Sequence, residues 1–177
     1  MTAISRAEVL GVAGALMLAA GGGCAVARAA QKGDPADIKA LNAAVAVELA
    51  AIAAYTSVIA TKLPAPAVLT VLNSFLADHR AHLETLSTAV TVAGGTPTTE
   101  AAPVQTPTFA KEGDVLAFVY TVERLAAGTH LGTLAEFKNR DLAKTSGSIL
   151  GVETTHVALL AEALRQNPAY PSGFITP

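Results

Sequence analysis

The chain has 177 residues, of which 51% are hydrophobic, 5% aromatic and 15% charged, and its formal net charge is −2. This length suits one domain with a sizeable core, and the Ala-rich, weakly charged composition favours closely packed helices over a disordered chain. A small negative charge without a cluster of Lys or Arg argues against a polyanionic partner, so we expect no nucleic-acid binding.

Residues 1–29 have the composition of an export signal peptide. Arg6 gives a weakly positive start, residues 9–20 are apolar, and residues 27–29 form a small-x-small cleavage site. The sequence around Arg6 also resembles a twin-arginine motif that has lost its second Arg, so Sec and degenerate Tat export both fit. We expect an exported protein, periplasmic or extracellular, with a lipoprotein site at Cys24 or a retained membrane anchor as the less favoured alternatives.

The first two predicted helices are joined by a short turn. Asp34-Pro35 is a residue pair typical of a helix N-terminus, and apolar residues recur at helical spacing from there to residues 63–66, where Pro64 and Pro66 end one helix and open the next. The second helix fades near Gly94-Gly95. A short turn between long helices predicts antiparallel neighbours.

The second half of the chain repeats this arrangement after a long connection. Residues 94–113 contain three prolines among Thr, Ala and Gly, which is typical of a crossover along a bundle. A third helix is predicted from near Asp114, and a turn near 139–141 leads to a fourth. We therefore expect an all-α protein: an antiparallel four-helix bundle over residues 34–167, with one long crossover between helices two and three, followed by a C-terminal tail over residues 168–177.

Six ionisable side chains interrupt these apolar helices in an ordered pattern: Glu48, His79, His82, Glu123, Glu153 and His156. Each half of the chain supplies a lone Glu and then, 31 or 30 residues later, a pair at i,i+3, which presents two side chains from one face of a helix. Buried carboxylates repel one another and lose hydration, and divalent cations would remove that cost. The pattern therefore predicts a metal site inside the bundle.

The ordered set resembles that of the ferritin-like superfamily of carboxylate-bridged dimetal proteins, which includes relatives of rubrerythrin, bacterioferritin and manganese catalase. On matching positions, Glu48 and Glu123 correspond to the terminal carboxylates, and residues 153–156 form a full Glu-x-x-His motif. Residues 79–82 are the counterpart pair, with His79 where the family has Glu. The resemblance covers roughly residues 34–167 and implies one or two divalent metal ions per chain, with iron as the first candidate and manganese or zinc as alternatives.

The histidine at position 79 changes what the resemblance implies. A carboxylate can bridge two metals, whereas a neutral imidazole binds one metal through a single nitrogen. Glu153 then remains as the obvious bridge, which favours a mononuclear or asymmetric site over a symmetric diiron oxidase. Asp78 is a poor substitute because it lies about 100° around the helix, and residues 78–80 can also be interpreted as a polar surface turn.

Two further polar residues follow the lone glutamates by seven positions. Tyr55 follows Glu48, and His130 follows Glu123, on the same helical stripes. They fit hydrogen-bond donors that orient the metal ligands. A core tyrosine and an interface histidine are the alternative interpretation.

Three functions fit these features. The first is redox chemistry on O₂ or peroxide by a non-haem iron or manganese oxidoreductase, with reductant from an external electron donor because the chain lacks Cys pairs. The second is a non-catalytic periplasmic protein that holds a metal ion. The third is a metal-free bundle with a stress-response role. A homodimer is compatible with the sequence, and a ferritin cage is not expected.

Overall fold

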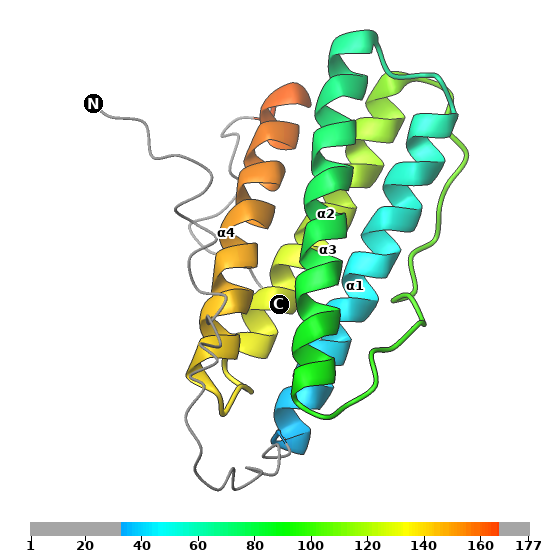
Figure 1. Cartoon of the computed structure of the whole chain (residues 1–177). Helices are drawn as coiled ribbons and strands as arrows, with labels where there is room; N and C mark the ends of the chain where they lie inside the picture. Colours follow the sequence, from blue (N-terminus) through cyan, green and yellow to red (C-terminus); the bar gives the residue numbers. More distant parts are fainter. Residues whose placement is uncertain (1–32, 167–177) are drawn as a thin grey trace, which may run out of the picture.

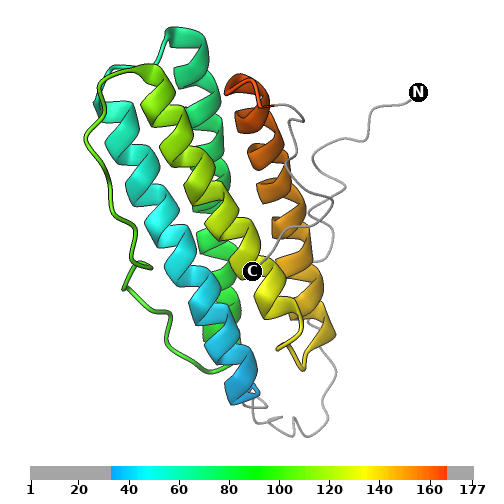
Figure 2. The ribbon, with the colours of Figure 1, turned by 180° about the vertical axis from the view of Figure 1, so that it is seen from behind.

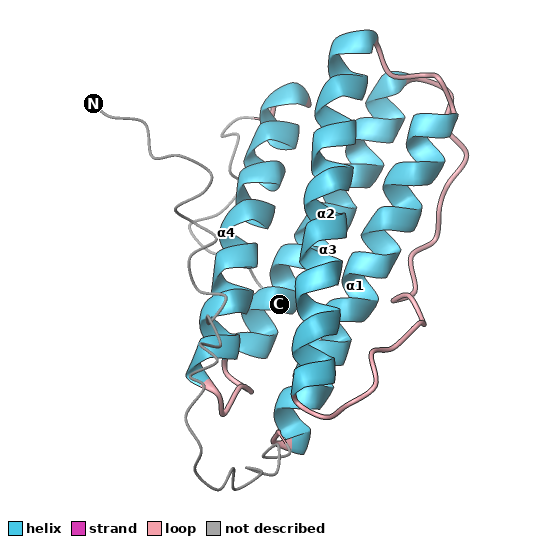
Figure 3. Cartoon of the chain, in the orientation of Figure 1, coloured by secondary structure: helices cyan, strands magenta, loops and turns pink. Residues whose placement is uncertain are grey.

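The computed structural model describes residues 33–166, which form four helices and no strand. These helices are α1 (Pro35–Ala60), α2 (Pro66–Val92), α3 (Glu112–Leu134) and α4 (Arg140–Ala163) (Figure 1). Two short turns and one long loop connect them (Figure 3). The predicted all-α four-helix bundle with one crossover is confirmed, while the predicted signal peptide and C-terminal tail lie outside the described residues.

Side-chain caps explain where three of the helices begin. Asp34 accepts a hydrogen bond from the backbone N–H of Ala36 at 2.8 Å, and Asn139 accepts one from Asp141 N–H at 2.9 Å, so both act as N-caps. Helix α3 begins at Glu112, slightly before the predicted Asp114. The reason is that the Asp114 carboxylate reaches back to two N–H groups just before the helix, at 3.0 and 3.2 Å, from a position inside the first turn.

The apolar core is divided into two clusters at different levels of the bundle. One contains Tyr55, Leu72, Val119 and Leu160, and the other contains Leu41, Val45, Leu86, Val90 and Ile149. On each of the four helices, the predicted ligands lie between or beside the residues that belong to these clusters. A polar layer is therefore enclosed between two apolar ones.

The helices are not equally close to one another. Helix α1 packs against α2 and α3, and α3 packs against α4, whereas α2 and α4 meet at few positions. Because the crossover returns the chain to the end where α2 began, α2 and α3 run in the same direction (Figures 1 and 2). Among the described residues, α1 alone is long and apolar enough to cross a membrane, but half of that stretch is buried inside the bundle, so this is weak support for an anchor.

The crossover runs along the outside of α1 (Figure 2). The Asn42 side chain donates to the carbonyl of Thr96 at 3.1 Å and accepts from the N–H of Thr98 at 2.8 Å. Gly95 permits the close approach, because a Cβ added there would lie 2.7 Å from Cγ2 of Ile38. The long loop is thus fixed to the bundle by backbone and amide contacts.

The N-terminal end of α1 is also tied to the turn between α3 and α4. Asp37 is buried, and its carboxylate accepts hydrogen bonds from the N–H groups of Lys138 at 2.6 Å and Asn139 at 3.2 Å. This contact satisfies two backbone donors at the start of α4. It links the two halves of the chain below the polar layer.

Candidate metal centre

All six predicted ligands converge in the polar layer. Glu48 comes from α1, Glu123 from α3, and the two i,i+3 pairs from α2 and α4. The side chains of the three glutamates and His79 are fully buried, His156 is 3% exposed, and the side chain of His82 is 12% exposed. The polar surface-turn interpretation of residues 78–80 is therefore wrong for His79, although Asp78 is partly exposed.

The six side chains form two overlapping groups that could each hold a metal ion. The first consists of Glu48, His79, His82 and Glu153, and the second of His79, Glu123, Glu153 and His156. Within each group, one ligand atom from every residue lies within 4.8 Å of the others. His79 and Glu153 belong to both groups, which places them where the two meet.

His79 lies between the two lone glutamates. Its Nδ1 is 2.8 Å from Glu48 Oε2, and its Nε2 is 3.0 Å from Glu123 Oε1. Both ring nitrogens therefore face carboxylates, which can only accept hydrogen bonds, so the doubly protonated imidazolium satisfies this arrangement. With these contacts His79 acts as a hydrogen-bonded cation between two anions.

Glu153 differs from the other two glutamates. Oε1 lies 2.9 Å from His82 Nδ1 and Oε2 lies 3.3 Å from His156 Nδ1, but within residues 33–166 neither carboxylate oxygen has an aligned hydrogen-bond donor. Within the same residues, His82 Nδ1 also lacks a hydrogen-bond partner. Buried polar atoms without partners are costly. A metal ion would satisfy all three atoms, so the residues present fit a divalent metal, for which carboxylate oxygen and imidazole nitrogen are suitable ligands.

Burial and hydrogen bonding oppose each other in setting the charges of the site. Burial raises the pKa of Glu48, but hydrogen bonds from His130 and His79, together with the nearby His82, outweigh it and hold the pKa of this carboxyl well below its usual value. Burial likewise raises the pKa of Glu123, and hydrogen bonds from His156 and His79 lower it further than burial raises it. Both carboxyl groups are therefore ionised at neutral pH.

The histidines respond in the opposite direction. Burial lowers the pKa of His79, but its bonds to Glu123 and Glu48 outweigh this effect and raise the pKa to about 11. The neighbouring carboxylates similarly overcome burial at His82 and His156, and raise the pKa of each to about 9. The argument that only a metal could neutralise the glutamates is therefore incomplete, because three protonated histidines can do so in the metal-free protein.

Two side chains outside the six form hydrogen bonds with the lone glutamates. The Tyr55 hydroxyl donates to Glu123 Oε1, and His130 Nε2 lies 2.9 Å from Glu48 Oε1. Each therefore bonds the glutamate of the other helix, not the one seven residues before it. The hydrogen-bonding interpretation of this pair fits the geometry better than the alternative of a plain core tyrosine and interface histidine.

Asp78 has a role that the sequence did not indicate. It is not a substitute for His79 in the site, but its Oδ2 lies 3.3 Å from His156 Nε2, on the side of the ring away from Glu123. The ring of Phe75 stacks on His156 with centroids 3.8 Å apart. The i−4 spacing of Phe75 and His79 on α2 was visible in the sequence, but no sequence pattern indicates that α4 presents His156 to Phe75 and Asp78.

Comparisons with known proteins agree with this geometry. A family model for the ferritin-like domain matches residues 36–166. No curated protein sequence matches the chain. Its fold is similar to that of a conserved hypothetical protein from Mycobacterium tuberculosis, with 22% identity and a TM-score of 0.67 over 80% of this chain and 97% of that one.

Two further solved structures have metal sites named in their descriptions. Ferritin-like diiron-carboxylate proteins from Bacillus anthracis share 21% identity and a TM-score of 0.63, over 72% of this chain and 94% of theirs. Rhodobacter capsulatus bacterioferritin, solved with a metal-free dinuclear site and haem iron, shares 19% identity and a TM-score of 0.68, over 77% of this chain and 88% of that one. These likenesses support the four-helix fold, and the family match establishes that the chain belongs to the ferritin-like domain family.

Proposed function

We propose that this protein binds one or two divalent metal ions in the polar layer and uses them in redox chemistry with O₂ or peroxide. The observation that carries the proposal is the carboxylate of Glu153, which is fully buried, lacks a hydrogen-bond donor at both oxygens and belongs to both potential ligand groups. Iron is the first candidate, with manganese or zinc as alternatives. A bound iron or manganese ion would supply one-electron exchange with the oxidant.

The residues that would hold metal fall into two overlapping groups. Glu48 and His82 would serve one ligand group, Glu123 and His156 would serve the other, and Glu153 is available to both. His79 can give a nitrogen to one group only, because its other nitrogen points at the opposite glutamate. This favours an asymmetric site, and it leaves a single metal ion as an alternative to two.

The cellular setting is also a proposal. The composition of residues 1–29 supports export, and a protein outside the cytoplasm would need an external electron donor for repeated turnover. The absence of Cys pairs in the sequence supports the same requirement, since the chain itself contains one cysteine.

The first test removes the shared carboxylate together with a terminal one. Glu153→Ala combined with Glu48→Ala should abolish tight metal binding, with a loss greater than the roughly 10- to 100-fold caused by removing an outer hydrogen-bond partner. Metal content is measured by elemental analysis of natively purified protein. Glu162→Ala, on the exposed face of α4, is the matched control. Unchanged metal content in the double variant would place the ligands elsewhere.

A second candidate function is metal binding without turnover. It is favoured by His79, which replaces a potential bridging carboxylate by an imidazole suited to zinc and copper as well as iron. Anaerobic loading with Fe(II), followed by measurement of O₂ or peroxide consumption, separates the two functions. Stoichiometric consumption supports the redox function, and Fe(II) that stays bound without consuming oxidant supports the binding function.

A further inference from the structure

His130 connects the metal-ligand layer to a part of the bundle that the proposed ligands do not reach. It lies on α3, is fully buried, and spans the α1–α3 interface so that its Nε2 is 2.9 Å from Glu48 Oε1. The other oxygen of Glu48, Oε2, faces His79. The two oxygens of this one carboxylate therefore have different surroundings.

The second ring nitrogen of His130 begins a string of buried hydroxyl groups. Its Nδ1 lies 3.1 Å from Ser146 Oγ, and Ser146 Oγ lies 3.2 Å from Thr133 Oγ1. All three side chains are at most 6% exposed. Both hydroxyls also contact the backbone carbonyl of His130, at 3.0 Å from Thr133 Oγ1 and 3.4 Å from Ser146 Oγ, so these buried polar groups have hydrogen-bond partners.

The direction of the first two hydrogen bonds follows from chemistry. The carboxylate of Glu48 can only accept, so His130 donates from Nε2. With this proton on Nε2, His130 accepts at Nδ1 from the Ser146 hydroxyl. The Thr133 hydroxyl donates to the backbone carbonyl of His130 at 3.0 Å and lies beside Ser146 Oγ. The hydrogen bonds from Ser146 to His130 and from His130 to Glu48 therefore run in one direction, and hydrogen bonds aligned in this way polarise and strengthen one another.

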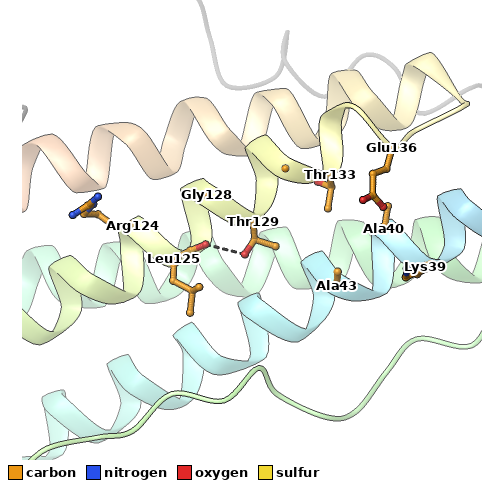
Figure 4. A pocket seen from close by; sticks show the side chains of 10 residues that line it. Lys39, Ala40, Ala43, Arg124, Leu125, Gly128, Thr129, Thr133 and Glu136 are labelled. Carbon is orange, nitrogen blue, oxygen red and sulfur yellow. Dashed lines mark hydrogen bonds between the residues drawn. The ribbon is translucent and has the colours of Figure 1, made fainter. Parts of the chain in front are cut away.

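The string ends at the surface of the bundle. Thr133 lines a groove of about 340 Å³ between α1 and α3, with Lys39 and Arg124 among the other lining residues (Figure 4). The corresponding glutamate of the other ligand group, Glu123, receives a hydrogen bond from the single phenol of Tyr55 instead. The two terminal glutamates therefore accept hydrogen bonds from different side chains outside the ligand set, Glu48 from His130 and Glu123 from Tyr55.

We propose that His130, backed by Ser146 and Thr133, is a positioning residue that holds Glu48 by Oε1 and directs Oε2 toward the metal. The inference rests on the proposed metal-binding function. His130 would affect the ligand group that contains Glu48, His82 and Glu153. In the group that contains Glu123 and His156, Tyr55 would orient the glutamate instead. The two metal positions therefore differ in how firmly their terminal carboxylate is oriented.

The test uses Co(II) as the probe, with affinity and visible absorption spectrum as readouts that do not depend on activity. His130→Leu should weaken the binding of one Co(II) equivalent by about 10- to 100-fold and alter its spectrum. His130→Gln, whose amide can still donate to Glu48, should restore much of the affinity. Ser146→Ala should weaken the same equivalent by about three- to tenfold, the effect of one hydrogen bond.

Thr145→Ala is the matched control, because it removes a hydroxyl from the neighbouring position of α4 whose hydrogen bond stays within its own helix. The full chain with all six ligands is used throughout, and circular dichroism of the metal-free variants verifies folding. If His130→Leu does not fold, Ser146→Ala and His130→Gln decide the matter. Wild-type affinity and spectrum in Ser146→Ala and in every folded His130 variant would overturn the positioning role alone. Failure of the wild-type chain to bind Co(II) would overturn the proposed function as well.

Discussion

At the scale of single residues, the most consequential position is His79. Its two nitrogens face Glu48 and Glu123 at 2.8 and 3.0 Å, so that one side chain joins the carboxylates of α1 and α3. In the metal-free protein this histidine supplies positive charge where a glutamate would add a fourth negative one. The same residue that neutralises the carboxylates limits how many of them are available to a metal.

That six candidate ligands share the interior of the bundle could be predicted from the sequence, because each interrupts an apolar helix at a spacing that aligns one face. The contacts between them could not. Spacing shows that His130 follows Glu123 on its own stripe, yet the structure pairs it with Glu48 on a different helix. Such cross-helix pairs depend on the relative rotation and translation of the helices, which no local pattern encodes.

Replacing His79 by glutamate tests this balance of charges. In the metal-free protein, His79→Glu removes a cation and adds a buried carboxylate, so we expect the free energy of unfolding to fall by about 3–5 kcal/mol. With Mn(II) or Fe(II) present, the added carboxylate should increase metal binding and recover part of the lost stability. Urea unfolding with and without metal measures both effects.

The control for this variant is Ala81→Glu, which adds the same side chain at an exposed position of α2. It should leave the stability within about 0.5 kcal/mol of the wild-type value. An equally stable or more stable metal-free His79→Glu protein would show that His79 is not a required counter-charge.

At the scale of elements, the starts of helices can be predicted from neighbouring residues in the sequence, whereas the contacts between a loop and a helix cannot. Asp34-Pro35 and Asn139 mark helix starts in the sequence and cap them in the structure. The crossover was predicted from its prolines and length. Its path along α1 was not, because it depends on Asn42, which in the sequence looks like any polar residue on a helix, and on the close approach at Gly95.

Asn42→Ala tests whether this attachment stabilises the fold. The change removes two hydrogen bonds to the backbone of residues 96–98, and because the site is only partly buried we expect a loss of about 1 kcal/mol in the free energy of unfolding. Chemical denaturation measures the loss. Asn73→Ala is the control, since Asn73 is exposed and bonds only within α2. Equal stability of the two variants would mean that the Asn42 side chain does not hold the crossover in place.

At the scale of the whole molecule, the ionisable layer lies between two apolar clusters. The clusters pack the helices on both sides of the layer, and the hydrogen bonds and charges within the layer add to that stability. The open side of the layer lies toward α2 and α4, which meet at few positions, and the side chain of His82 is 12% exposed. The sequence predicted the layer from its ordered residues, but the sparse contact between α2 and α4 arises only from the assembled bundle.

The stability of the metal-free protein should depend more strongly on pH than that of the metal-bound protein. The folded-state pKa values of His79, about 11, and of His82 and His156, about 9, lie above the ordinary value of 6.5, so the folded metal-free protein holds more protons than the unfolded chain. The contribution of these histidines to stability is therefore fully present below pH 6.5 and is lost as the pH rises toward 9 and then 11. The lowered pKa values of Glu48 and Glu123 add the acid limit, because their contribution is lost as the pH falls below 4.5.

A metal ion must displace the histidine protons, so its affinity should rise with pH, by roughly tenfold per pH unit for each proton released. We therefore expect the melting temperature of the chelator-treated protein to fall between pH 6.5 and 9, while that of the Zn(II)-loaded protein falls less, so that the gap between them widens. Thermal unfolding at several pH values measures the gap. His156→Gln should flatten the decline of the metal-free protein, because its glutamine does not titrate in this range. A melting temperature of the metal-free wild-type protein that rises with pH over the same interval would contradict the protonated-histidine account of the site, since it would require the unfolded chain to hold more protons than the folded one.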